Sequence, residues 1–264
     1  MTKPAQGEAV LVQRRGTVTR LTLNRPLSLN AIDEGLAATL IRELQRVAAD
    51  PRCRCLTITG AGRGFCAGQS LAGGAGELPK DIGALVRSRY IPIIKSIRAL
   101  PIPVVAEVNG VAAGAGFALA LAADIRLASE NAWFSCGFAK IGLVPDSGLS
   151  YFLPRSLGIS RAFEMTATSR PISASEAYDL GLVAHVYPAD SCTAEFQAFA
   201  QQLAAGPTRA LALTKTALTL GLVQHLDDQL ELEAQLQQEA SETSDFGEGV
   251  TAFLERREPH FEGR

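Results

Sequence analysis

Apolar and polar positions alternate along the first part of the chain and then recur at helical spacing. Residues 9–23 hold two stretches rich in β-formers, VLVQ and TVTRLTL, on either side of Gly16, and they predict a hairpin. Residues 31–49 place apolar side chains on one helical face. These side chains are Ile32, Leu36, Leu40, Ile41, Leu44 and Val47. We expect a helix there, with Asn30 as its N-terminal cap.

The central part of the chain repeats an order of one or two strands followed by a helix. Strands are expected at residues 53–60, 103–110, 124–128, 133–136 and 182–188. Helices are expected near 81–98, where Pro92 makes the helix irregular, at 115–123, and after Ser147. The pattern predicts an α/β fold that is built from recurring ββα-like units.

The pattern becomes helical throughout after Pro207. Helices are expected at residues 207–223, 227–242 and 247–257, without a further strand. We therefore divide the chain into a core of residues 1–200 and a helical region of residues 201–264. The leucines of the middle helix are Leu226, Leu230, Leu232 and Leu236, and they lie among Gln and Glu. This suits packing on a partner subunit or on the chain's own core.

Composition excludes several classes of partner. The chain has 264 residues, 47% of them hydrophobic, which is enough for a large core. Its 25 Lys and Arg against 27 Asp and Glu form no basic stripe, so nucleic acid is not an expected partner. The longest apolar run, residues 110–123, is shorter than the roughly 20 residues that span a bilayer. Since the N-terminus lacks the apolar stretch of a secretory signal, we expect a cytoplasmic protein without membrane contact.

The cysteines do not predict a metal site. All five lack paired CxxC spacing and have no histidine close in sequence to complete a zinc set. We expect them to be small core residues.

Two glycine-rich segments each follow a predicted strand, GAGRGFCAGQSL (60–71) and NGVAAGAGFALAL (109–121). Glycine lets backbone amides approach a ligand closely. The second segment opens a helix, so the amides near Ala115 lie where the helix dipole favours negative charge. Neither segment fits a phosphate loop or a dinucleotide fingerprint in suitable context. One amide from each loop would instead form an oxyanion hole.

Five segments carry a resemblance to a known family. They are NRPLSLNA (24–31), GRGFCAGQSL (62–71), NGVAAGAG (109–116), KIGLVPDSG (140–148) and EGVTAFLERREPHF (248–261). In this order the chain resembles the enoyl-CoA hydratase/isomerase, or crotonase, family over nearly its whole length. It is most similar to the phenylacetate branch of epoxide-to-oxepin CoA isomerases, which share GRGFCAGQ and NGVAAGAG. The resemblance implies a ClpP-like right-handed spiral of ββα units whose C-terminal helices trimerise, giving a homotrimer or a dimer of trimers.

The resemblance also implies where a coenzyme A thioester binds. By motif position, the backbone amides of Gln69 and Ala115 would hold the thioester oxygen. Ala115 stands where the family usually has glycine, and Ser70 stands where many members have aspartate. Residues implied near the adenine, the pantetheine or the thioester are Arg25, Leu27, Ala67, Gly68, Ser70, Leu71, Gly114 and Phe138. No separate cofactor is expected, because coenzyme A is part of the substrate.

Lys215 is a further candidate for the coenzyme A site. Its side chain could reach a phosphate, including one bound across a subunit boundary. By base rate, however, a solvated surface lysine is the commoner situation.

One carboxylate remains for proton transfer. Hydratases of the family divide this work between two glutamates, and Ala118 and Phe138 occupy those positions here. Neither side chain can exchange a proton. Asp146 is left, and its apolar neighbours Phe138, Leu143 and Val144 should raise its pKa. A single carboxylate can take a proton from one carbon of an allylic thioester and return it to another, so we expect double-bond isomerisation.

Other interpretations stay open. Taken alone, Asp146 fits a helix N-cap, because Pro-Asp-Ser-Gly is common turn chemistry. The chain could instead be an enoyl-CoA hydratase with an altered site, or a protein that binds acyl-CoA without catalysis. Direct attack by Asp146 on carbon, as in 4-chlorobenzoyl-CoA dehalogenases, is not expected, because the activating histidine of those enzymes has no counterpart here. The acyl group stays unspecified, because loop residues 71–95 carry no readable code for it.

Overall fold

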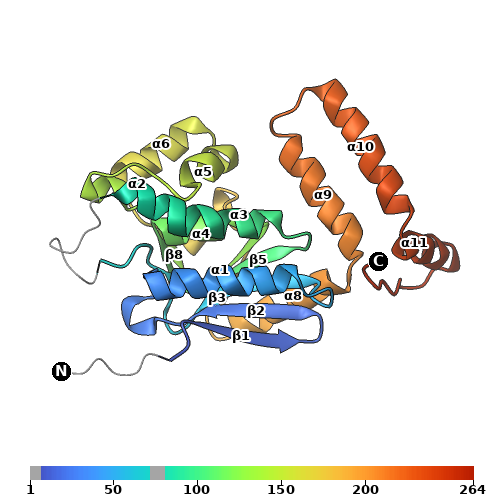
Figure 1. The fold of residues 1–264 in the computed structure, drawn as a ribbon, viewed down its shortest axis with the longest axis horizontal. Helices are drawn as coiled ribbons and strands as arrows, with labels where there is room; N and C mark the ends of the chain where they lie inside the picture. Colours follow the sequence, from blue (N-terminus) through green and yellow to red (C-terminus); the bar gives the residue numbers. More distant parts are fainter. Residues whose placement is uncertain (1–6, 72–80) are drawn as a thin grey trace.

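The computed structural model describes residues 7–71 and 81–264 (Figure 1). Its main layer is a six-stranded sheet in the order β1-β2-β3-β5-β7-β10. The strands are β1 (Val10–Arg15), β2 (Val18–Leu23), β3 (Cys55–Gly60), β5 (Val104–Val108), β7 (Ile125–Ser129) and β10 (His185–Tyr187). β1 and β2 form the expected antiparallel hairpin, and the other neighbouring strands of this sheet run parallel.

A second, smaller sheet has the order β4-β6-β8-β9. Its strands are β4 (Gly64–Cys66), β6 (Val111–Ala113), β8 (Trp133–Ser135) and β9 (Ile172–Ser173). β4, β6 and β8 follow β3, β5 and β7 after short turns, and they run parallel to one another. Each repeat therefore gives one strand to each sheet, which confirms the predicted ββα units. The sequence did not indicate β6, because three small apolar residues between glycines have no period of their own.

Helices cover both faces of the main sheet. The side chains of α1 (Glu34–Ala48), α3 (Ile91–Ala99) and α4 (Ala115–Ala122) belong to the core on one face, and α8 (Cys192–Ala205) covers the other. In β5, Val104 and Ala106 face the first core and Val105 faces α8, as alternation along a strand requires. α4 is buried at every residue, so the second glycine-rich segment ends at the centre of the molecule.

The remaining helices of the core are short. They are α2 (Ile82–Leu85), α5 (Leu149–Leu157), α6 (Ile159–Thr168) and α7 (Ala174–Asp179), with a π turn at Val86–Tyr90 and 3-10 turns at Pro26–Ser28 and Phe138–Ile141. The predicted irregular helix near 81–98 consists of α2, the π turn and α3 in direct succession. Pro92 is the second residue of α3 and directly follows the π turn, so its missing N–H falls where the helix changes its winding.

The N-terminal cap of α1 is Asp33, so the prediction of Asn30 was wrong. Asp33 Oδ1 accepts a hydrogen bond of 2.7 Å from a backbone amide in the first turn of α1. Asn30 is buried, and its side-chain amide donates to the carbonyls of Ala61 and Gly64 while its oxygen accepts from the backbone of Arg25. Asn30 thus ties the segment before α1 to the turn between β3 and β4.

Replacing Asp33 with alanine is expected to lower the free energy of unfolding by about 1 kcal/mol, because the first turn of α1 loses its side-chain acceptor. Asp33→Asn keeps an acceptor and should stay within about 0.5 kcal/mol of the wild type. Urea denaturation of both variants measures the difference. Equal losses in the two variants would instead assign the effect to the ion pair of Asp33 with Arg25, which spans 3.3 Å.

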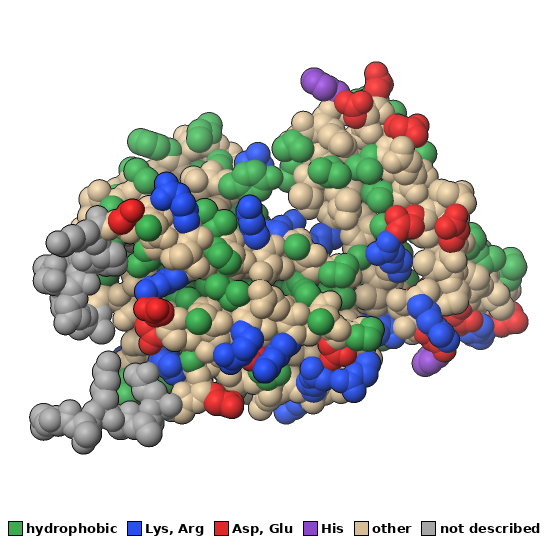
Figure 2. Space-filling model, in the orientation of Figure 1, with side chains coloured by type: hydrophobic (Ala, Val, Ile, Leu, Met, Phe, Trp, Pro, Cys, Tyr) green, Lys and Arg blue, Asp and Glu red, His purple; other side chains and the backbone are tan. Residues whose placement is uncertain are grey.

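The C-terminal helices α9 (Thr208–Leu220), α10 (Leu226–Ser241) and α11 (Ser244–Glu255) extend away from the core (Figure 1). α10 packs along α9, and in the described chain it has no buried residue. Large apolar side chains stay exposed on these helices and in the turn between α9 and α10, namely Leu218, Leu222, Val223, Leu226, Leu230, Phe246, Val250, Phe253 and Leu254. Figure 2 shows apolar side chains at the surface of this region. Packing within one chain therefore does not bury them. α8 continues across residue 200, and the division into two domains stays a prediction.

Candidate active site

The first glycine-rich segment forms β4 and the loop that follows it. The carbonyl of Gly68 accepts a hydrogen bond of 2.7 Å from the amide of Ile32, and the amide of Ser70 donates to the carbonyl of Ile32 at 3.0 Å. Gln69 lies between these two contacts, so its own N–H points to the opposite side, as in a parallel bridge. Within the described residues, this amide has no hydrogen-bond acceptor.

The second glycine-rich segment runs from β6 into α4. Gly114 has φ of +53° and ψ of −124°, a conformation that requires glycine, and it is followed by Ala115 as the first residue of α4. The amide of Ala118 donates to the carbonyl of Gly114, which closes the first turn. The amide of Ala115 precedes that turn, and it too has no acceptor in the part of the chain that the structure describes.

The two loops touch each other through their glycines. A Cβ added to Gly68 would lie 2.8 Å from the carbonyl oxygen of Ala113 and 3.3 Å from the amide nitrogen of Ala115. A Cβ added to Gly116 would lie 2.1 Å from the carbonyl oxygen of Cys66. Only glycine allows this approach, and it brings the loop of Gln69 against the start of α4. The amides of Gln69 and Ala115, which have no acceptor among the described residues, thus belong to two loops in contact.

Asp146 lies in the turn between residues 138–141 and α5. Its side chain is half-buried and accepts a hydrogen bond of 2.7 Å from the hydroxyl of Ser147. α5 begins after Gly148 without a side-chain cap, so the interpretation of Asp146 as a helix cap was wrong. Burial raises the pKa of Asp146, and the Ser147 hydroxyl opposes the shift, which confirms the predicted direction. Of the apolar neighbours named for this shift, Phe138 is buried, whereas Leu143 and Val144 are 40% and 79% exposed.

Tyr90 contacts the side chain of Gln69 in the first loop. It is 3% exposed, and its hydroxyl donates to Gln69 Oε1 at 2.5 Å. Burial raises the pKa of Tyr90, with further contributions from Cys66 and from the negative charge of Asp146. Sequence reasoning missed Tyr90, since nothing in a local pattern links an irregular helix to the loop around Gln69.

Phe138 and Ala118, the positions of the two family glutamates, also lie at the second loop. Phe138 is buried, and its ring is 4.0 Å from where a Cβ of Gly114 would be. Ala118 is buried in the first turn of α4. Of the three positions named for proton transfer, 118, 138 and 146, only Asp146 therefore carries a carboxylate.

Comparison with known proteins identifies the family. The sequence profile described as Enoyl-CoA hydratase/isomerase matches residues 13–264. The chain belongs to this family, the crotonase family. A Rhodobacter capsulatus protein named "Probable enoyl-CoA hydratase" is 43% identical over 92% of this chain and 94% of its own length. The 1,2-epoxyphenylacetyl-CoA isomerase of Escherichia coli (strain K12) is 41% identical over 97% of this chain and 99% of its own.

Solved structures agree with this assignment. The crystal structure of an enoyl-CoA hydratase from Bacillus anthracis superposes with a TM-score of 0.92 at 32% identity, covering 97% of this crotonase and 100% of the other chain. The comparisons confirm the resemblance to the crotonase family and to its phenylacetate branch, as well as the crotonase α/β fold. The protein is thus an enoyl-CoA hydratase/isomerase family enzyme, which sets aside a purely non-catalytic acyl-CoA-binding protein.

Most residues expected around coenzyme A lie on the loops of this crotonase site. Ala67, Gly68, Ser70 and Leu71 flank Gln69, and Gly114 and Phe138 adjoin Ala115. Arg25 contacts Asp33 at 3.3 Å, and Leu27 is fully exposed in the 3-10 turn that precedes α1. Of the loop expected to form the acyl pocket, residues 71–95, positions 72–80 lie outside the described residues. No helix in the described ranges, 7–71 and 81–264, is long and apolar enough to cross a membrane.

Lys215 is held inside the crotonase chain. Its ammonium lies 2.9 Å from Asp124 Oδ2, 3.2 Å from the carbonyl of Leu100 and 3.5 Å from that of Ile97. The interpretation as a solvated surface lysine was therefore wrong. A phosphate contact would require Lys215 to give up one of these three acceptors.

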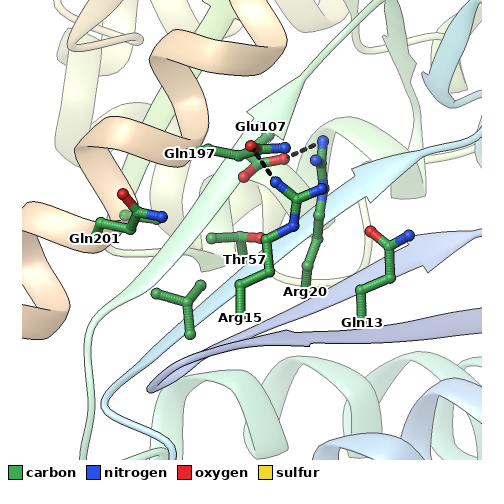
Figure 3. Close-up of a pocket in the computed structure, with 9 residues that line it drawn as sticks. Gln13, Arg15, Arg20, Thr57, Glu107, Gln197 and Gln201 are labelled. Carbon is green, nitrogen blue, oxygen red and sulfur yellow. Dashed lines mark hydrogen bonds and ion pairs between the residues drawn. The ribbon is translucent and has the colours of Figure 1, made fainter.

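A second polar cluster lies on the other side of the main sheet, between the sheet and α8 (Figure 3). Arg20 Nη2 forms an ion pair of 2.6 Å with the buried Glu107, and Arg15 donates to Gln197 at 2.6 Å. Burial raises the pKa of Glu107, and Arg20 opposes this shift. The cavity among these residues is about 20 Å³, which is room for one water molecule. It cannot hold an acyl thioester.

Proposed function

We propose that this crotonase is an enoyl-CoA isomerase in which Asp146 moves a proton and the amides of Gln69 and Ala115 hold the thioester oxygen. The observation that supports the proposal is the contact between two loops, each of which carries a backbone amide without an acceptor among the described residues. Asp146 supplies a half-buried carboxylate whose pKa burial raises. The family's two glutamate positions, Ala118 and Phe138, hold side chains that cannot exchange a proton.

The reaction balances without a cofactor. The carboxylate of Asp146 removes a proton from C2 of a 3-enoyl thioester, and the electron pair moves through the carbonyl to give a dienolate. The negative oxygen of the dienolate accepts hydrogen bonds from the N–H groups of Gln69 and Ala115. The carboxylic acid of Asp146 then returns the proton to C4, which gives the 2-enoyl thioester and restores the carboxylate.

We assign the coenzyme A part of the substrate to the loops that carry the free amides. Gly68 and Gly114 keep side chains away from the thioester, and the exposed Leu27 and Leu71 are available to pantetheine and adenine. We further propose that the exposed apolar side chains of α9, α10 and α11 pack in a homotrimer, or in a dimer of trimers, in the cytoplasm. Burial of such side chains would provide the association energy.

A hydratase is the second candidate function. It is favoured by one specific observation, the name "Probable enoyl-CoA hydratase" of the Rhodobacter capsulatus relative. Hydration would require Asp146, without a second acid, both to activate water and to supply the α-proton. The 1,2-epoxyphenylacetyl-CoA isomerase relative favours the isomerase.

A substrate panel distinguishes these functions. Purified protein is incubated with 3-hexenoyl-CoA, 2-hexenoyl-CoA and 1,2-epoxyphenylacetyl-CoA, and products are followed by mass and ultraviolet absorbance. The expected result is a gain of conjugated enoyl absorbance from 3-hexenoyl-CoA at unchanged mass. Addition of one water to 2-hexenoyl-CoA at a greater rate would establish the hydratase instead. Rearrangement of the epoxide at unchanged mass would extend the isomerase to ring substrates.

A further inference from the structure

Tyr90 lies where a helix changes its winding. The π turn Val86–Tyr90 joins α2 to α3, and π turns inside helices are frequent at functional sites. The ring of Tyr90 is buried in the main core, so the position of its hydroxyl is fixed by packing. That hydroxyl donates to Gln69 Oε1, so it links the core to the loop that carries the backbone amide of Gln69.

The side chain of Gln69 is held at both ends. Its Oε1 accepts from Tyr90, and its Nε2 donates to the carbonyl of Ser70 at 2.9 Å. The backbone on either side is held by Ile32, through the carbonyl of Gly68 and the amide of Ser70. Within the described residues, the backbone N–H of Gln69 is a donor that none of these contacts uses. The hydrogen bond from Tyr90 links the side chain of Gln69 to the π turn that precedes α3.

Tyr90 is a hydrogen-bond donor at neutral pH. The ordinary pKa of a tyrosine already lies well above neutral, and burial raises it further, so the phenol stays protonated. A neutral phenol that donates to a neutral amide adds no charge to the site. Its effect on the reaction is therefore geometric.

We propose that Tyr90 is a positioning residue whose hydroxyl, through the side-chain amide of Gln69, fixes the backbone N–H that holds the thioester oxygen. The inference rests on the proposed function, because it assigns that N–H to the oxyanion hole. Tyr90 itself touches no reacting atom. Its removal should weaken stabilisation of the dienolate more than it weakens substrate binding.

The kinetic test is Tyr90→Phe, which keeps the buried ring and removes only the hydroxyl. We expect kcat for 3-hexenoyl-CoA to fall about fivefold to tenfold, as loss of one hydrogen bond predicts, with KM changed less than about twofold. Gln69→Leu should cause a similar loss, and the double variant should lose no more than either single variant. The matched control is Tyr187→Phe, which removes a half-buried hydroxyl on β10. An unchanged kcat in Tyr90→Phe, or additive losses in the double variant, would overturn the inference.

A spectroscopic measurement separates this inference from the proposed function. An Asp146→Asn background keeps a ¹³C-labelled enoyl-CoA bound without turnover, and its carbonyl stretching band reports the pull of the two amides. We expect a shift to lower wavenumber on binding and a smaller shift after Tyr90→Phe is added. An equal shift in the proteins with and without the Tyr90 hydroxyl would overturn the role of Tyr90 and leave the oxyanion hole in place. No shift in either protein would overturn the oxyanion hole, and the inference with it.

Discussion

Replacement of Asp146 by asparagine should lower kcat for isomerisation of 3-hexenoyl-CoA by about 10³-fold, within the range expected for loss of a general acid–base group. Asparagine has nearly the same shape and cannot take or return a proton. The free amides of Gln69 and Ala115 stay in place, so the thioester should still bind and KM should change little. Steady-state kinetics on the purified variant measures both constants.

Two controls separate catalysis from folding. Asp190→Asn removes an exposed carboxylate outside the site and should keep wild-type kcat. The stability of Asp146→Asn gives the second control. Because burial raises the pKa of Asp146 in the folded state, this group contributes most to stability below its unfolded pKa, and that contribution is lost as pH rises through the folded pKa. At neutral pH the asparagine variant should therefore be at least as stable as the wild type. Low activity together with low stability would instead attribute the loss of activity to unfolding.

The pH dependence of the wild type follows from the same shift. A base works in its ionised form, so kcat should fall as pH decreases through the pKa of Asp146 in the bound complex. Since burial raises that pKa above the ordinary 3.8, the fall should begin at a higher pH than for an exposed aspartate. A kcat that stays constant down to the ordinary aspartate range would assign proton transfer to another group.

The sequence predicted the parts of this fold in which one period dominates. The hairpin β1–β2 alternates cleanly, and α1 repeats its leucines at helical spacing, so both were identified. β4, β6 and β9 were not, because β4 and β6 are three residues inside glycine-rich segments and β9 is only two residues long. The cap of α1 was misplaced by three residues, because Asn30 and Asp33 are both good caps and only the long-range contacts of Asn30 with Ala61 and Gly64 assign it elsewhere.

The site shows the same division between local and long-range information. Gln69, Ala115 and Asp146 could be proposed from the sequence, since the glycine motifs and the vacant glutamate positions lie in short continuous segments. Tyr90 was missed and Lys215 was misjudged, because their partners lie far along the chain. A lone lysine is usually solvated, and nothing near Lys215 in sequence points to Asp124, which holds it. Sequence patterns thus identified the groups proposed to do chemistry, and the structure was needed for the groups that hold them.

The oxyanion hole can be tested by removing an amide hydrogen alone. Proline at position 115 has no N–H, and the first position of a helix is where proline is best tolerated. The preceding residue, Gly114, has no Cβ to clash with the ring, and its φ of +53° with ψ of −124° is the mirror image of the extended conformation that precedes proline. Ala115→Pro is therefore expected to preserve α4 while deleting one of the two proposed donors.

Ala115→Pro should lower kcat by about 10²-fold to 10³-fold, the usual cost of losing one oxyanion-hole donor. Ala115→Gly keeps the N–H and restores the residue usual in the family, so it should keep kcat within about threefold of the wild type. The ring of proline occupies the place of the amide hydrogen, so KM distinguishes two causes of a loss. A fall in kcat at nearly constant KM assigns the loss to the missing hydrogen bond, because that bond strengthens as charge develops on the oxygen. A rise in KM alone, with kcat retained, would show that the ring only obstructs the thioester and that Ala115 does not stabilise the dienolate.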